Sequence, residues 1–237
     1  MTQSHLNHLQ LLQLADSALP IGSTAHSFGL ETLVAAGRLT TPQLAGFFGD
    51  YIMEAGAVEA LYGRLAYRAA ALADERDFET RWLDLNARLS ALKPARESRQ
   101  ASAMLGKRFL HLAGSLIEPS SPVLHLASAS ALRAGIDLHH ATVFGVVGQV
   151  LGIDEELTVL AYLQQNLAGL ISACQRLLPL GQRQAAQLSW QLKPALIAAA
   201  QVSQDGDLDG PAAYSCATLV DVAAMQHPGL PTRLFIS

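Results

Sequence analysis

Apolar residues recur along most of this chain at intervals of three and four positions, the spacing that puts side chains on one face of an α-helix. The pattern is clearest after Asp154, a residue type that caps helix N-termini. From there it runs through Leu157, Leu160, Leu167, Leu170, Ile171, Cys174 and Leu178. The sequence therefore predicts a long amphipathic helix that begins at Asp154 and ends at the stretch LPLGQ (178–182).

Turn-forming residues separate further segments with the same spacing. Gly37 is placed to end a short helix that contains Leu30 and Leu33. Thr41 followed by Pro42 predicts an N-cap with proline in the first helical position. The predicted helices cover residues 5–15, 30–36, 41 to about 73, 78–89, 95 to at least 109, 123–133, 139–151 and 154–178, followed by one last helix from 183 to about 200.

The composition agrees with helices packed on helices. Half of the residues are hydrophobic but only 6% are aromatic, so the apolar residues are mostly Ala and Leu, both strong helix formers. No internal repeat or clear linker divides the chain. We therefore expect an all-α fold, a single domain over residues 1–237 built as a bundle of roughly eight to ten helices.

Charge and cysteine content argue against several classes of protein. The formal net charge is −4, so no overall positive field attracts nucleic acid or an anionic membrane. The longest weakly polar run, Ala141–Ile153, is well short of the roughly 20 residues that span a membrane. The first residues lack the basic and apolar regions of a signal peptide. Cys174 and Cys216 form neither a disulfide framework nor a zinc motif. These features predict a soluble, cytoplasmic protein.

Two stretches imitate ligand-binding motifs and fail at a required position. The sequence DGDLDG (205–210) opens like an EF-hand loop, but Cys216 stands where the bidentate Glu is needed. Gly106 and Lys107 look like the end of a phosphate-binding loop, but Arg108 replaces the hydroxyl residue that follows Lys. We expect no cofactor and no resident metal.

The sequence also offers no catalytic constellation. Glu31, Glu54 and Glu59 lie on predicted helices without a partner that the sequence reveals, and no nucleophile and base have a recognisable spacing. This predicts that the protein is not an enzyme. A basic stretch leaves two interpretations open, a solvated helix face or a docking surface for an acidic partner protein. It consists of Arg88, Lys93, Arg96, Arg99, Lys107 and Arg108.

Both ends of the chain carry bulky apolar groups where fraying is the usual behaviour. The segment Leu14–Leu39 contains small polar residues, Pro20 and three glycines, and the tail ends in LFIS. Chain ends of this kind are usually held on the body of the protein or on another chain. The sequence therefore predicts an interaction protein with a docking segment at residues 1–39 and a tail at residues 222–237.

Five blocks of the sequence resemble the UreF family of urease accessory proteins and occur in the family's order. They are LLQLADSALPIGSTAHSFGLE (11–31), ARESRQASAMLGKRFL (95–110), HHATVFGVVGQVLGI (139–153), AYLQQNLAGLISACQRLLPLGQ (161–182) and MQHPGLPTRLFIS (225–237). Together they span nearly the whole chain, and the first, fourth and last are the most specific.

The resemblance implies a non-enzymatic, all-α adaptor for nickel insertion into apo-urease. It implies that the chain dimerises and binds a UreD/UreH-type accessory protein. With that partner it would recruit and modulate a UreG-type GTPase. Neither nucleic acid nor a membrane is among the implied partners.

The same resemblance implies a set of partner-binding residues at the two ends. They are Ser17, Leu19, Pro20, Gly22, Ser27, Gly29, Leu30 and Glu31 in the opening motif, and His227, Arg233, Leu234, Phe235 and Ser237 in the tail. Glycine at position 29 lets another backbone approach closely. Two interpretations of Glu31 remain equal, a contact with a basic group of a partner or stabilisation of the first turn of its own helix.

The sequence departs from the family pattern at two positions. Thr24 stands where the family usually has an aromatic residue, which removes a possible hot-spot ring. Ile236 stands where a polar residue is common. A rival interpretation from another class is a metallochaperone that holds nickel itself through His227 together with Cys216 or Cys174.

Overall fold

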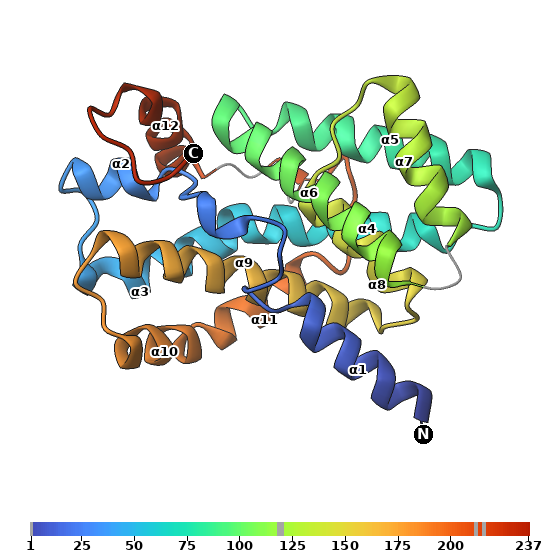
Figure 1. Ribbon diagram of the computed structural model, residues 1–237, viewed down its shortest axis with the longest axis horizontal. Helices are drawn as coiled ribbons and strands as arrows, with labels where there is room; N and C mark the ends of the chain where they lie inside the picture. The colour runs from blue at the N-terminus through green and yellow to red at the C-terminus, as the bar shows by residue number, and fades with distance from the viewer. Residues whose placement is uncertain (1, 118–120, 211–212, 215–216) are drawn as a thin grey trace.

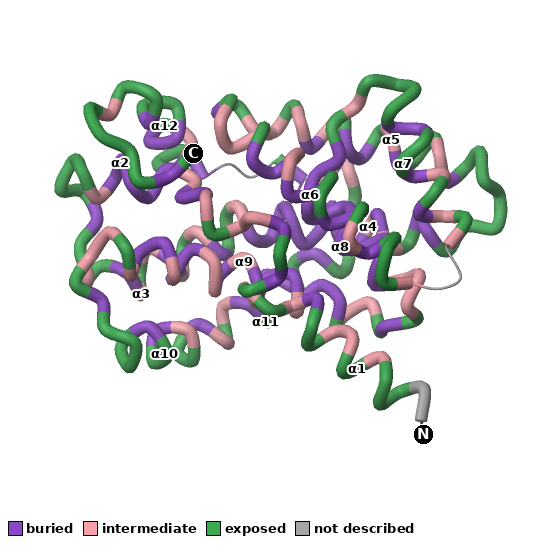
Figure 2. The backbone as a smooth tube through the Cα atoms, viewed as in Figure 1, coloured by how far each residue is buried: buried purple, intermediate pink, exposed green. Residues whose placement is uncertain are grey.

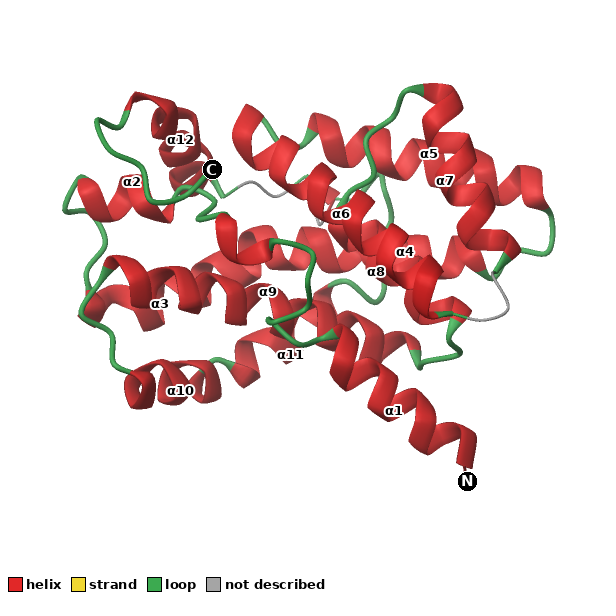
Figure 3. Ribbon diagram, viewed as in Figure 1, coloured by secondary structure: helices red, strands yellow, loops and turns green. Residues whose placement is uncertain are grey.

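The computed structural model describes residues 2–117, 121–210, 213–214 and 217–237. Over these residues the chain forms helices and loops without a strand (Figure 3), which confirms the all-α prediction. The α-helices are α1 Thr2–Leu14, α2 Leu30–Ala35, α3 Leu44–Tyr51, α4 Ala57–Ala70, α5 Glu75–Ala91, α6 Arg96–Leu116, α7 Pro122–Ala134, α8 His140–Val150, α9 Glu155–Leu177, α10 Gln182–Gln191, α11 Lys193–Val202 and α12 Thr218–Gln226.

Helices α4, α8 and α9 form the centre of the molecule, and the buried residues concentrate there (Figure 2). The tightest crossing is that of α4 and α8, where two glycines meet. A Cβ atom added to Gly145 would lie 1.9 Å from the carbonyl oxygen of Gly63. The small-residue composition of 139–151 thus allows two helix backbones to touch, and this brings side chains of both helices into one core.

Helix α9 lies across this core and is the longest helix. By length and composition it is the one described helix that could cross a membrane, but 56% of its most apolar window is buried inside the protein. Burial of this kind is expected of a central helix in a globular fold. Its predicted start is confirmed, because the Asp154 side chain accepts a hydrogen bond of 3.0 Å from the Leu157 amide.

Helix α1 projects from the body at the edge of the molecule (Figure 1). Leu9 and Leu12 on its apolar stripe are 66% and 69% exposed, whereas Leu14 at its end is buried. The helix predicted at 5–15 therefore forms. It is held at its buried last turn and by a hydrogen bond of 2.9 Å from the Asn7 side chain to the Gly152 carbonyl.

Other helix boundaries differ from the sequence prediction for local reasons. The cap before Pro42 is Thr40 rather than Thr41, because Gln43 reaches back to the Thr40 amide at 2.9 Å. The expected helix 41–73 contains one turn of π-helix at Ile52–Gly56. Gly37 has a φ of 68°, as predicted for a residue that ends a helix.

The single helix expected over 183–200 is wrong. The chain forms α10 and α11 with a break at Leu192, because Pro194 has no amide hydrogen to continue the hydrogen bonds of α10. The sequence reasoning also did not separate α12 from the tail.

The close crossing of α4 and α8 generates a test of packing. Gly145→Ala should lower the free energy of unfolding by about 1–3 kcal/mol, because the added methyl group has to push the two backbones apart. Gly114→Ala on α6 is the matched control, since nothing lies within 4 Å of its added Cβ. That change should raise stability by about 0.5–1 kcal/mol. Urea unfolding of both variants measures the difference, and equal effects would contradict the crossing.

Candidate functional site

The segment 25–31 and the tail 227–237 lie side by side, and together we call them the terminal clasp (Figure 1). The Ser27 amide donates a hydrogen bond of 2.5 Å to the main-chain oxygen of Ser237. The Ile236 amide donates a hydrogen bond of 2.9 Å to the main-chain oxygen of Ala25. The two ends that the sequence marked as unusual are therefore held by each other.

The carboxylate of Glu31 is the centre of the terminal clasp. It accepts hydrogen bonds from the amides of Leu234 at 2.6 Å and Phe235 at 3.1 Å, and it contacts the His227 ring at 2.9 Å. Burial on its own raises the pKa of this carboxyl, but the bonds from these three residues outweigh burial and the pKa lies below its ordinary value. Glu31 is therefore a buried carboxylate whose donors come from the tail.

His227 is fully buried between two carboxylates from different helices. Its Nε2 faces Glu31, and its Nδ1 faces Glu97 on α6 at 2.6 Å. The ring therefore contacts both carboxylates at once, one at each nitrogen. Arg233 also contacts Glu97, at 3.3 Å. These contacts join the tail to α2 and α6.

Gly29 allows α12 to lie directly on the segment 25–31. An added Cβ at this position would lie 2.7 Å from the Val220 carbonyl oxygen and 3.0 Å from the Ala224 nitrogen. Gly29 also has a φ of 89°, a conformation that favours glycine. The expectation that a backbone approaches closely at Gly29 is confirmed, and the backbone is that of α12.

Arg176 fixes the far side of the terminal clasp to α9. Its guanidinium lies 4.2 Å from the centre of the Phe235 ring and donates a hydrogen bond of 2.8 Å to the Thr24 carbonyl. Thr24, which stands where an aromatic ring is usual, therefore binds Arg176 through its main-chain carbonyl. Phe235 is buried against the body of the protein.

The residues implied as partner-binding differ in how far they are buried. Most are buried, namely Leu19, Ser27, Gly29, Leu30, Glu31, His227, Phe235 and Ser237. Pro20, Arg233 and Leu234 are exposed, and Ser17 and Gly22 are half-buried. Partner binding by these residues stays a prediction. In this structure the buried ones contact other parts of the same chain.

A second set of residues at this end of the molecule was missed in part by the sequence reasoning, which named Leu234 and Ile236 but not the members on α12. Apolar side chains of α12 and the tail are 40–64% exposed, and we call them the outer face. They are Leu219, Val222, Met225, Leu234 and Ile236. The signal that could have found the first three is their spacing of three residues. The opposite side of α12 packs on α2 and α6.

The basic stretch is mostly occupied within the chain. Lys93 pairs with Glu59, and Arg99 donates to the Lys93 carbonyl at 2.6 Å. Arg108 donates to the Ile21 carbonyl at 3.2 Å, and Arg88 pairs with Asp84. Four of the six cations therefore have a partner within the chain. The Arg88–Asp84 pair lies on the exposed surface of α5, in agreement with the solvated-face interpretation. Glu59, which seemed to lack a partner, has one in Lys93.

The described residues hold no group of three or more His, Cys, Asp and Glu arranged to bind a metal ion. Both nitrogens of His227 face carboxylate oxygens. Burial raises the pKa of the Cys174 thiol to about 12, which keeps it protonated. Cys216, the other cysteine of the metallochaperone interpretation, lies outside the described residues.

Comparison with known proteins points to one family. A sequence model of the UreF family matches residues 40–193. A protein of Nostoc sp. is 35% identical over 100% of this chain and 98% of its own length. Proteins of Lachnoclostridium phytofermentans and Haemophilus influenzae are each 32% identical, over 97% and 96% of this chain and 98% and 94% of their own lengths. All three are called urease accessory protein UreF.

The first test of the terminal clasp is Glu31→Gln. The neutral amide removes the charge that the tail amides and His227 share, and hydrogen bonds to charged groups contribute about 1.5–3 kcal/mol. Amide hydrogen exchange at Leu234 and Phe235 should therefore accelerate about 10- to 100-fold. Glu54→Gln, at an exposed position of the π-helical turn between α3 and α4, is the control and should leave both rates unchanged. Unchanged rates in Glu31→Gln would show that the carboxylate does not hold the tail.

A second test uses pH. Because folding lowers the pKa of Glu31, its contribution to stability is complete above the ordinary pKa of 4.5 and is lost as the pH falls through the lowered value. The tail should therefore loosen in acid before the rest of the chain unfolds. NMR signals of Phe235 and Ile236 followed from pH 7 into the acid range measure this. Glu31→Gln should lack the acid dependence that comes from this group.

Proposed function

This chain belongs to the UreF family of urease accessory proteins, and on that basis we propose that it is a non-enzymatic adaptor for nickel insertion into apo-urease. It binds a UreD/UreH-type accessory protein, and the two recruit and modulate a UreG-type GTPase. The protein acts as a homodimer in the cytoplasm.

The observation that carries this proposal is the outer face supported by the terminal clasp. Apolar side chains left in water cost free energy, and exposed apolar groups that gather at one place are typical of binding surfaces. Here three of them lie on α12, and Leu234 and Ile236 lie on the tail that follows it. The contacts of Glu31, His227 and Glu97 hold the tail in place. A surface ordered before binding loses less entropy when a partner docks.

The ionisable groups of the clasp support an adaptor better than an enzyme. Glu31, Glu97 and His227 are bonded to one another and to the main chain, so their hydrogen-bonding capacity serves to position the tail. A catalytic acid or base would need an atom directed towards a bound substrate.

We assign two roles to the implied partner-binding residues. The buried members, with Glu31 at the centre, shape and fix the surface. The exposed members, Pro20, Arg233 and Leu234, contact the UreD/UreH-type partner directly, together with the rest of the outer face. A Gly29→Trp substitution would act on the first role, since its side chain would displace the α12 backbone.

Co-purification is the direct test of the adaptor function. The tagged chain is expressed with the UreD/UreH-type and UreG-type proteins of its organism and analysed by size exclusion with light scattering, with and without GTP. A stoichiometric complex is expected, and the free chain should elute as a dimer. Elution without any partner, combined with stoichiometric micromolar binding of nickel by the isolated chain, would favour a metallochaperone instead.

Single substitutions test the outer face more sharply. Leu234→Asp and Met225→Asp place a charge on exposed apolar positions, which should weaken UreD/UreH binding at least about tenfold and leave the thermal midpoint nearly unchanged. Leu132→Asp on α7 is the matched control, because Leu132 is 85% exposed and lies outside the clasp. If all three variants bind the partner equally well, the outer face is not part of the interface.

A further inference from the structure

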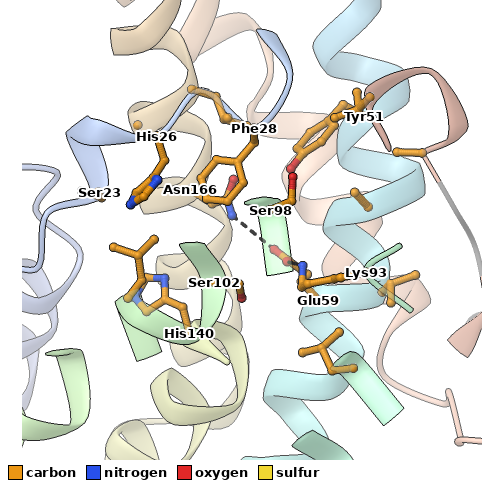
Figure 4. Close-up of a pocket in the computed structure, with 18 of the residues that line it drawn as sticks. Ser23, His26, Phe28, Tyr51, Glu59, Lys93, Ser98, Ser102, His140 and Asn166 are labelled. Carbon is orange, nitrogen blue, oxygen red and sulfur yellow. Dashed lines mark hydrogen bonds and ion pairs between the residues drawn. The ribbon is translucent and has the colours of Figure 1, made fainter. Parts of the chain in front are cut away.

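A cavity of about 110 Å³ lies beneath the terminal clasp. Its wall is formed by the segment 23–28 together with α4, α6, α8, α9 and α12. Figure 4 shows His26 and His140 on one side of this cavity and Glu59 and Lys93 on the other. Apolar side chains, including Leu105, form much of the wall. An ordered water occupies roughly 10–15 Å³ on this scale, so the cavity has room for several waters or a small organic molecule.

The charged groups of the cavity already satisfy one another. Lys93 pairs with Glu59, and the Tyr162 hydroxyl and the Asn166 amide donate to the same carboxylate at 2.7 and 3.2 Å. Burial raises the pKa of Glu59, but the Lys93 ammonium and the hydrogen bonds from Lys93 and Tyr162 lower it by more, so the group is a carboxylate. Asp221 is the one other charged side chain in the described wall, and it is half-buried.

Three other polar side chains of the wall have an atom without a partner. The Nε2 atoms of His26 and His140 and the Oε1 atom of Gln165 are buried, and the described part of the chain offers none of them a hydrogen bond. The three residues are at most 7% exposed. Buried polar groups are normally hydrogen-bonded. Three such atoms in one cavity wall therefore indicate a site for a bound molecule.

The orientation of these groups defines the chemistry of that molecule. The Gln165 amide nitrogen donates to the carbonyls of Leu14 and Asp16 at 2.9 and 3.3 Å, so its oxygen is left to accept. Burial lowers the pKa of His26, with a smaller effect of Arg108, and burial lowers the pKa of His140 to about 4. Both rings are therefore neutral near pH 7. A charged ligand would find no uncompensated opposite charge on them.

We propose that this cavity binds a small uncharged molecule that donates hydrogen bonds. Its donor meets Gln165 Oε1, its other polar atoms meet Nε2 of His26 and of His140, and any apolar part contacts the leucine wall. Ordered water and a small organic amide are two sources of this same chemistry. The proposal is independent of the adaptor function. His26 also contacts the Ser237 hydroxyl at 2.7 Å, so the occupant touches a residue that holds the tail.

The test is an NMR titration of the full chain with its histidines labelled with ¹⁵N. Acetamide is the probe, and acetone, which has the same number of heavy atoms but no N–H donor, is the matched control. Acetamide should shift the imidazole signals of His26 and His140 saturably, and acetone should bind about three- to tenfold more weakly, the ratio expected for one hydrogen bond.

Water gives the second arm of the same experiment. If acetamide causes no saturable shift, long-lived water close to the two rings in magnetisation-transfer spectra supports the site with solvent as its occupant. Absence of both acetamide binding and long-lived water overturns the proposal.

A variant then tests the assigned atoms. His140→Phe keeps a ring against Phe109, Phe144 and Tyr162, whose centres lie 5.2–6.0 Å apart in this cluster, and removes Nε2. It should weaken acetamide binding about three- to tenfold, or release the water near this position. His111→Phe, at an exposed position of α6, should change neither. Unchanged binding in a folded His140→Phe protein would contradict the site, and if that variant does not fold, the wild-type titration decides.

Discussion

A carboxylate removed from water must be supplied with hydrogen-bond donors, and the terminal clasp follows from how Glu31 meets this requirement. Its donors are two tail amides and the ring of His227, about 200 residues further along the chain. The tail lies where it can serve this one side chain. Glu97 then balances the second ring nitrogen of His227 and extends the network to α6.

At this end of the molecule the polar contacts that position the tail are therefore buried, and apolar side chains are exposed. Charged hydrogen bonds are directional, so they determine where the tail lies. Apolar contacts are less directional and suit a surface that has to bind a partner. Gly29 completes the arrangement because α12 can rest on the α2 segment at backbone distance, which leaves Met225 and its neighbours facing outward.

The helical core and the terminal clasp meet at the polar cavity. The close crossing at Gly63 and Gly145 brings α4 and α8 together, and α9 crosses both. Glu59, His140 and Tyr162 consequently come from three helices into one space. His26 joins this space to the tail through Ser237. His26 therefore both lines the cavity and contacts the tail.

The sequence by itself determined that the chain is helical, and for most helices it also determined where they begin and end. Helix periodicity and caps such as Asp154 and Gly37 are local properties, written within a few residues of each other. It also marked both chain ends as held segments and carried the resemblance to one family. Only the tertiary structure decided that the ends hold each other, that Glu31 meets the tail, and that Lys93 neutralises Glu59. Periodicity reports that one face of a helix is buried but not what buries it. Pairings between residues 34–204 positions apart therefore had to come from the packing of the whole chain.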